Sequence, residues 1–170
     1  MKAIVYTSNT GFTARYAAML GEMTGLPVYT LTEACKKLEK KTPILYLGWL
    51  FASTVKGYGK ASSRFAVKAL IAVGMCDTGT LLDDVRRVNE LPRRLPVFTV
   101  QGGMDHSKLR GINKFMINAL IKFMSRAKNR TPGDTRKLQL IIEGGDFVCE
   151  ENLAQFMAFY REAQHEQADA

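Results

Sequence analysis

Seven consecutive residues near the N-terminus carry four hydroxyl side chains around one glycine. Residues 7–13 read Thr-Ser-Asn-Thr-Gly-Phe-Thr and lie between a β-branched segment and a segment with helical spacing. Backbone N–H groups at a helix N-terminus favour anions, and Gly11 permits a tight turn there. The pattern predicts a phosphate cradle completed by the hydroxyls of Ser8, Thr10 and Thr13. The alternative is that these hydroxyls only cap the helix.

The sequence motifs that are absent from this loop limit which phosphate-bearing ligand is expected. It has neither G-x-G-x-x-G nor the lysine of a Walker A motif, so a dinucleotide or a nucleoside triphosphate is not the expected ligand. A single terminal phosphate fits the loop better.

Other reactive side chains point to no particular chemistry. Cys35, Cys76 and Cys149 are far apart and form no C-x-x-C pair, so we expect free thiols and no metal site. Asp105 and His106 follow a predicted strand and are candidates for an acid/base pair, although a solvated loop histidine is the commoner case. The sequence assigns no catalytic residue.

The elements that must position this loop follow from hydrophobic spacing and from Gly and Pro punctuation. Predicted strands cover Lys2–Tyr6, Leu26–Leu31, Pro43–Gly48, Val67–Gly74 and Pro96–Gln101. Predicted helices cover Thr13–Thr24, Thr32–Lys40, Thr80–Leu91, Ile112–Met124 and Glu150–Gln164. The segment Trp49–Lys60 is expected as a Gly-rich loop, and Leu138–Ile142 as a small edge strand or an ordered loop.

The strands are apolar through their centres, which is typical of a parallel sheet covered by helices on both faces. The alternation of strands and helices predicts one doubly wound α/β domain over residues 1–170. No apolar stretch approaches the ~20 residues of a membrane span, and the N-terminal segment lacks a signal-peptide pattern, so we expect a cytoplasmic protein.

The chain is basic, with 24 Lys and Arg residues against 16 Asp and Glu and a net charge of +8. Nine cations gather with only one acid, Asp134, in a short stretch: Lys108, Arg110, Lys114, Lys122, Arg126, Lys128, Arg130, Arg136 and Lys137. An acidic partner or the inner face of a membrane is expected to contact this region. No nucleic-acid-binding motif accompanies the charge, which argues against DNA or RNA.

The loop Ser8-Asn9-Thr10-Gly11-Phe12-Thr13 resembles the T/S-x-T-G-x-T phosphate loop of the flavodoxin family. Within that family the chain is most similar to the flavodoxin-type, quinone-linked protoporphyrinogen oxidases. That similarity depends on Lys114-Phe115-Met116-Ile117 and Asp134-Thr135-Arg136-Lys137. Phe12 departs from the family, many members of which carry Asn there.

The resemblance implies a five-stranded parallel sheet of order 2-1-3-4-5, with FMN as the cofactor. It also implies that loops after the third and fourth strands enclose the flavin ring. The cofactor-binding residues expected on this basis are Thr7, Ser8, Asn9, Thr10, Gly11, Phe12, Thr13, Trp49, Leu50, Phe51, Ala52, Gly74, Met75, Cys76, Asp77 and Gly79. Trp49, Phe51 or Tyr58 would stack on the ring. The alternative for Trp49 is a buried position in the core, and the alternative for Cys76, which could be redox active, is a buried structural thiol.

The expected function is electron transfer by an FMN-binding flavoprotein. The alternative is a flavin-dependent oxidoreductase of the protoporphyrinogen oxidase or quinone reductase type, and a third possibility is a binding module without FMN. The partner is then a redox protein or a small molecule such as a quinone or a porphyrinogen.

Overall fold

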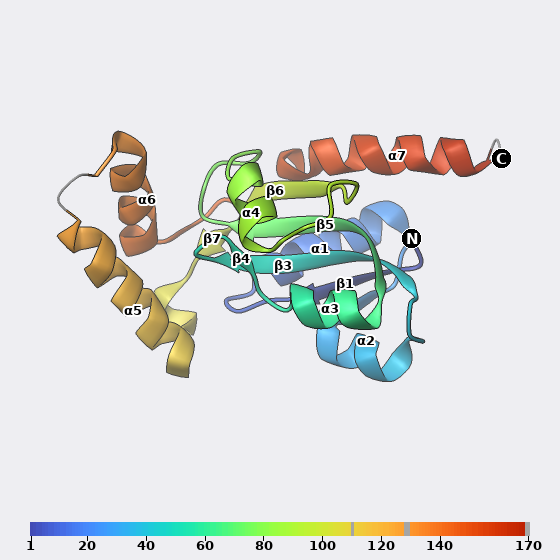
Figure 1. Cartoon of the computed structure of the whole chain (residues 1–170), viewed down its shortest axis with the longest axis horizontal. Coiled ribbons are helices and arrows are strands. Elements are labelled where there is room, and N and C mark those ends of the chain that lie inside the picture. The colour runs from blue at the N-terminus through green and yellow to red at the C-terminus, as the bar shows by residue number, and fades with distance from the viewer. Residues whose placement is uncertain (110, 128–129, 169–170) are drawn as a thin grey trace.

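A mostly parallel sheet forms the centre of the protein in a computed structural model that describes residues 1–109, 111–127 and 130–168 (Figure 1). The predicted basic residues Arg110 and Lys128, and the side chain of Ile112, lie outside this described part. The sheet order is β2-β1-β3-β5-β6, so the predicted doubly wound topology of the five main strands is confirmed. These strands are β1 (Ala3–Thr7), β2 (Val28–Thr30), β3 (Pro43–Phe51), β5 (Ala66–Gly74) and β6 (Val97–Gln101).

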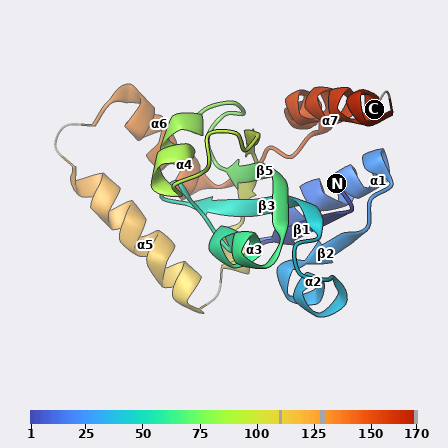
Figure 2. The same ribbon diagram turned by 45° about the vertical axis from the view of Figure 1, so that its right-hand side comes forward.

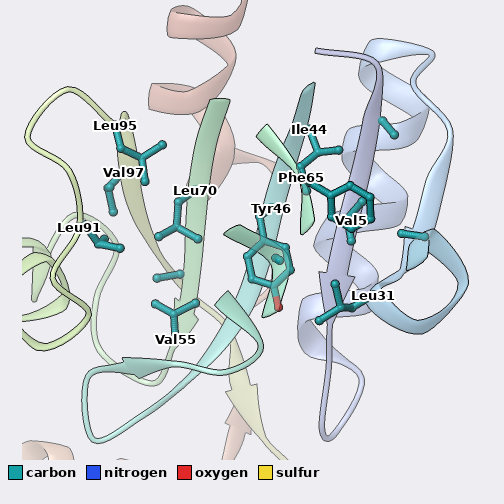
Figure 3. Packing of buried hydrophobic residues seen from close by; sticks show 14 of the residues in the cluster. Val5, Leu31, Ile44, Tyr46, Val55, Phe65, Leu70, Leu91, Leu95 and Val97 are labelled. Atoms are coloured by element: carbon teal, nitrogen blue, oxygen red, sulfur yellow. The ribbon is translucent and has the colours of Figure 1, made fainter. Parts of the chain in front are cut away.

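Helices cover both faces of the sheet, as predicted. The first face packs against α2 (Leu31–Lys37), α3 (Tyr58–Arg64) and α4 (Leu82–Val88), and Figure 3 shows the buried side chains between the layers. The other face packs against α1 (Phe12–Thr24) and α7 (Ala154–Ala168). Tyr46 and Leu70 point to the first face, while Leu45 and Ile71, one residue along each strand, point to the second. Burial on both faces explains the uninterrupted apolar strands.

Two helices, α5 (Gly111–Arg126) and α6 (Pro132–Glu143), pack against each other beyond the carboxyl ends of the strands (Figures 1 and 2). The prediction of an edge strand or ordered loop at Leu138–Ile142 was wrong, because these residues belong to α6. The local cause is a capping box, in which Thr131 and Asp134 exchange side-chain hydrogen bonds around Pro132. That start signal fixes a helix over the residues that follow it.

Several short elements were absent from the predictions. The expected Gly-rich loop contains β4 (Thr54–Val55), which pairs antiparallel with β3, and then α3. Strands β7 (Gly103–Met104) and β8 (Gly145–Asp146) pair with each other and bracket the α5/α6 pair. The last predicted helix begins as the 3-10 helix η2 (Glu150–Leu153) before α7, and η1 (His106–Lys108) follows β7. Within the described ranges, no helix combines the length and the apolar character needed to cross a membrane.

Candidate functional site

Four strand ends meet at one edge of the sheet and enclose a small cavity. Its volume is about 50 Å³. The cavity collects the loops after β1, β3, β5 and β6, as expected for the carboxyl edge of a doubly wound sheet. The residues that line it are Ser8, Asn9, Thr10, Phe12, Thr13, Trp49, Leu50, Val73, Gly74, Met75, Gly103, Met104 and Ile117.

The N-terminus of α1 has free hydrogen-bond donors at this cavity. Gly11 is its N-cap in the left-handed region, with φ 100°, and no described side chain caps the helix. The Gly11 N–H donates to Ser8 Oγ at 3.2 Å, which closes the loop into a turn. Thr13 is 2% exposed, and no partner among the described residues hydrogen-bonds the Thr10 or Thr13 hydroxyl. The first-turn N–H groups and these hydroxyls therefore form a donor set suited to an anion.

Thr7 has a structural role. Its hydroxyl donates to the carbonyl oxygen of Lys56 at 2.7 Å and lies 3.0 Å from the Tyr46 hydroxyl. Tyr46 donates to the same carbonyl at 2.8 Å, and burial raises the pKa of Tyr46 to about 12. The next residue, Gly57, has φ 82°, and a Cβ there would lie 2.3 Å from the Tyr46 hydroxyl. This network ties β1 to the chain that leaves the β3/β4 hairpin.

The Phe12 ring packs the loop at residues 7–13 against β7. A Cβ built on Gly103 would lie 2.6 Å from Phe12 Cε1 and 2.4 Å from the Gly145 carbonyl oxygen. The ring therefore packs directly on the glycine backbone of β7. Any side chain at position 103 would push Phe12 away, so an aromatic residue at 12 and a glycine at 103 depend on each other.

Trp49 reaches the cavity from the end of β3. Its ring lies edge-on to Phe51, with centroids 6.4 Å apart, and the ammonium of Lys56 lies 5.9 Å and 5.2 Å from the two rings. Trp49 and Leu50 line the small cavity, whereas Phe51 and Ala52 line a neighbouring cavity. Trp49 and Phe51 thus lie at the predicted edge, on different walls, whereas the third candidate, Tyr58, lines neither cavity and packs near Tyr46.

The turn between β3 and β4 is held in a strained conformation. Ala52 and Ser53 have φ values of 46° and 62°, the left-handed pair of a two-residue hairpin in which Asn-Gly is usual. Asn89, which ends α4, accepts from the Val55 N–H at 2.8 Å and donates to the Ser53 carbonyl at 2.8 Å. Side-chain hydrogen bonds from another layer therefore fix the turn beside the cavity.

The loop after β5 supplies backbone and side chains to the same edge. Gly74 and Met75 line both cavities, and Cys76 lines the second, where burial raises the pKa of its thiol. Asp77 lies 3.9 Å from the Arg136 guanidinium of α6. Gly79 contacts neither cavity: its N–H donates to the Thr99 carbonyl at 2.9 Å and anchors the loop to β6.

Four lining residues of the small cavity are absent from the predicted cofactor-binding set: Val73, Gly103, Met104 and Ile117. The signal for Gly103 and Met104 was present, because Gln101–His106 follows β6 at the same edge. Ile117 had no local signal, since only the position of α5 brings it there. Asp105 and His106 do not form an acid/base pair: Asp105 accepts from Ser107 at 2.6 Å, and His106 Nε2 lies 2.8 Å from the Ile141 carbonyl oxygen.

The donor set fits the phosphate of FMN, and the ring half of the site is narrow. A cavity of about 150 Å³ binds one benzene ring, so about 50 Å³ admits a three-ring flavin only if lining side chains move. Met75, Met104 and Ile117 fill the space, and the two methionines have many rotamers of similar energy. Binding of FMN therefore requires these side chains to rearrange.

No group of three His, Cys, Asp or Glu side chains suited to a metal ion occurs among the described residues. Comparisons with protein-family models, with curated proteins and with solved structures found no match to this chain.

Proposed function

We propose that the protein binds FMN non-covalently at the carboxyl edge of its sheet and transfers electrons through it. One observation carries the proposal: the N-terminus of α1 opens into the cavity that Trp49 and Met75 also line, and its Thr10 and Thr13 hydroxyls have no hydrogen-bond partner among the described residues. Anion donors and apolar side chains thus line one cavity, as FMN requires.

Each part of the chain has a separate task in this proposal. The first turn of α1 and its hydroxyls hold the phosphate, and Trp49 supplies an apolar face for the ring. The flavin supplies one- and two-electron chemistry when bound. Lys56 keeps a positive charge beside the Trp49 and Phe51 rings, and the loop at Gly74 allows close backbone approach.

Titration with FMN and with riboflavin tests the proposal. Thr13→Ala should weaken FMN binding by about 1.5 to 3 kcal/mol, the value of a hydrogen bond to a charged group, and should leave riboflavin binding unchanged. Thr135→Ala removes an exposed hydroxyl of α6 and serves as the matched control. Equal affinity of the wild-type chain for FMN and riboflavin would refute the phosphate assignment, and no binding of either would leave the chain a binding module without FMN.

A small-molecule oxidoreductase, of the protoporphyrinogen oxidase or quinone reductase type, is the second candidate. The observation that favours it is the position of α5 and α6, which cover part of the edge and place Ile117 against the site. A carrier between proteins needs that edge open to its partner. Turnover of a quinone or of protoporphyrinogen by the FMN-loaded chain would support the enzyme, and electron exchange with proteins alone would support the carrier.

The exposed side of α5 supports a peripheral contact of this protein with an anionic membrane surface. Such a contact agrees with the expected cytoplasmic location at the inner face of the membrane. Phe115 and Phe123 are each 74% exposed, and the side chains of Lys114, Lys122 and Arg126 are exposed on the same helix. Apolar rings flanked by cations are typical of helices that lie at a membrane surface.

A further inference from the structure

A second cavity, of about 200 Å³, lies between the edge of the sheet and the helical pair α5/α6. It shares five lining residues with the candidate cofactor site: Leu50, Gly74, Met75, Met104 and Ile117. The opposite wall comes from Leu120 and Met124 of α5 and from Ile141 of α6. The two cavities are therefore neighbours that share part of their walls.

The lining of this second cavity is mainly apolar. Phe51 and Ala52 close it from the β3/β4 turn, and Cys76 and Leu81 close it from the segment after β5. Burial raises the pKa of the Cys76 thiol, which keeps that wall uncharged at neutral pH. Apolar groups facing each other across a space of this kind favour a hydrophobic ligand.

Two charged side chains reach the cavity, Asp84 and Lys137, and only Asp84 forms an ion pair among the described residues. Asp84 is paired with Arg87 at 2.7 Å. Lys137 of α6 is half-buried, and no carboxylate in the described ranges forms an ion pair with it. Asp134, three residues earlier on α6, interacts with Lys137 electrostatically without forming an ion pair. The Lys137 ammonium can therefore pair with an anionic group of a ligand in this apolar space.

The volume limits the size of the ligand. A cavity of 150 Å³ accepts one benzene ring, so about 200 Å³ accepts one or two fused rings. A macrocycle of four pyrrole rings does not fit this space unless α5 and α6 move.

We propose that this cavity binds an anionic aromatic molecule of one or two rings, with its rings against Leu120, Met124 and Ile141 and its anionic group at Lys137. Its assignment as the small-molecule partner of the flavin rests on the proposed function, because the two cavities share a wall. Binding of the ligand itself does not require FMN.

A matched pair of probes, 2-naphthoate and the neutral 2-naphthamide, tests the proposal by isothermal titration of the full chain. We expect 2-naphthoate to bind about five-fold more tightly, as for a partly exposed charge pair. Lys137→Gln should abolish this preference and retain 2-naphthamide binding. Lys114→Gln, at an exposed position of α5, should behave as wild type.

A cavity-filling variant, Leu120→Trp, should weaken both probes at least ten-fold, with a thermal melting curve showing that it folds. Equal binding of the two probes to the wild-type chain, or a charge preference that survives Lys137→Gln, would overturn the proposal. The titration is repeated with FMN added. Probe binding without any FMN binding would support the ligand proposed for this cavity and refute only the flavin assignment. FMN binding without probe binding would support the flavin assignment and refute the ligand proposed for this cavity.

Discussion

The side-chain amide of Asn89 donates a 2.8 Å hydrogen bond to the carbonyl oxygen of Ser53, 36 residues earlier in the chain. The same side chain accepts from the Val55 N–H and donates to the Val85 carbonyl, each at 2.8 Å. Asn89 thus connects the end of α4 to the β3/β4 turn. That turn carries Phe51 and Ala52, which form one wall of the second cavity.

Asn89→Ala should destabilise the fold, because it leaves partly buried backbone groups of the turn without partners. We expect a loss of about 1 to 3 kcal/mol in the free energy of unfolding, measured by urea denaturation. Asn118→Ala, an exposed site on α5, is the control and should change stability by less than about 0.5 kcal/mol. A loss of unfolding free energy no larger than that of the control would show that the turn is stable without the Asn89 hydrogen bonds.

Ala52→Gly should stabilise the protein by about 0.5 to 1 kcal/mol, because glycine occupies the left-handed region without the steric cost that a Cβ brings. Ala52 has φ 46°. Ala154, with φ −54° and ψ −45°, provides the matched control. The same substitution there should destabilise by about 0.5 to 1 kcal/mol. Urea denaturation of both variants measures the change in the free energy of unfolding. A destabilised Ala52→Gly variant would contradict the inference that Ala52 is strained.

Stability should fall between pH 10 and pH 12 through Tyr46. Its folded-state pKa is raised to about 12 from 10 by burial, so the folded protein retains a proton that the unfolded chain loses. The contribution is complete below pH 10 and disappears as pH rises through the folded pKa, by about 3 kcal/mol in total. Tyr46→Phe should flatten this part of the curve of unfolding free energy against pH. An equally steep curve in the variant would assign the loss to other tyrosines.

Emission from Trp49 should fall when FMN binds, because it lines the proposed site and is the single tryptophan of the chain. Removal of FMN by dialysis should restore the emission. Riboflavin at the same free concentration is the control for light absorption by the flavin. Unchanged emission with FMN bound would place the ring away from Trp49, toward Phe51 or Tyr58.

The exposed side of α5 should bind vesicles that contain anionic lipid and release them at high salt. Replacing both Phe115 and Phe123 by Ser should lower the fraction bound about ten-fold, since each ring loses apolar burial. Vesicles of neutral lipid are the control and should bind weakly. Vesicle binding that does not depend on salt or on lipid charge would show that electrostatic attraction does not contribute to it.

The sequence by itself determined the sheet and the edge at which the loop at residues 7–13 lies. Apolar strands separated by helical spacing require a covered parallel sheet, and the order of its five main strands agrees with the flavodoxin-like prediction. The loop at residues 7–13 had to lie at the carboxyl edge, because it follows the first strand directly. Trp49 and Gly74 lie at that edge for the same reason, since the parallel pairing of β3 with β5 ends at Trp49 and Gly74 is the last residue of β5.

Only the tertiary structure decided what closes the site. The capping box at Thr131 is a local signal for α6, but the packing of α5 and α6 against the sheet edge joins residues far apart in the chain. Ile117 and Lys137 become lining residues through that packing alone. Likewise, the Thr7 hydroxyl donates to the Lys56 carbonyl, because the β3/β4 hairpin returns the chain to β1. Local spacing encodes which element forms, whereas contacts between distant elements determine which side chains share a cavity.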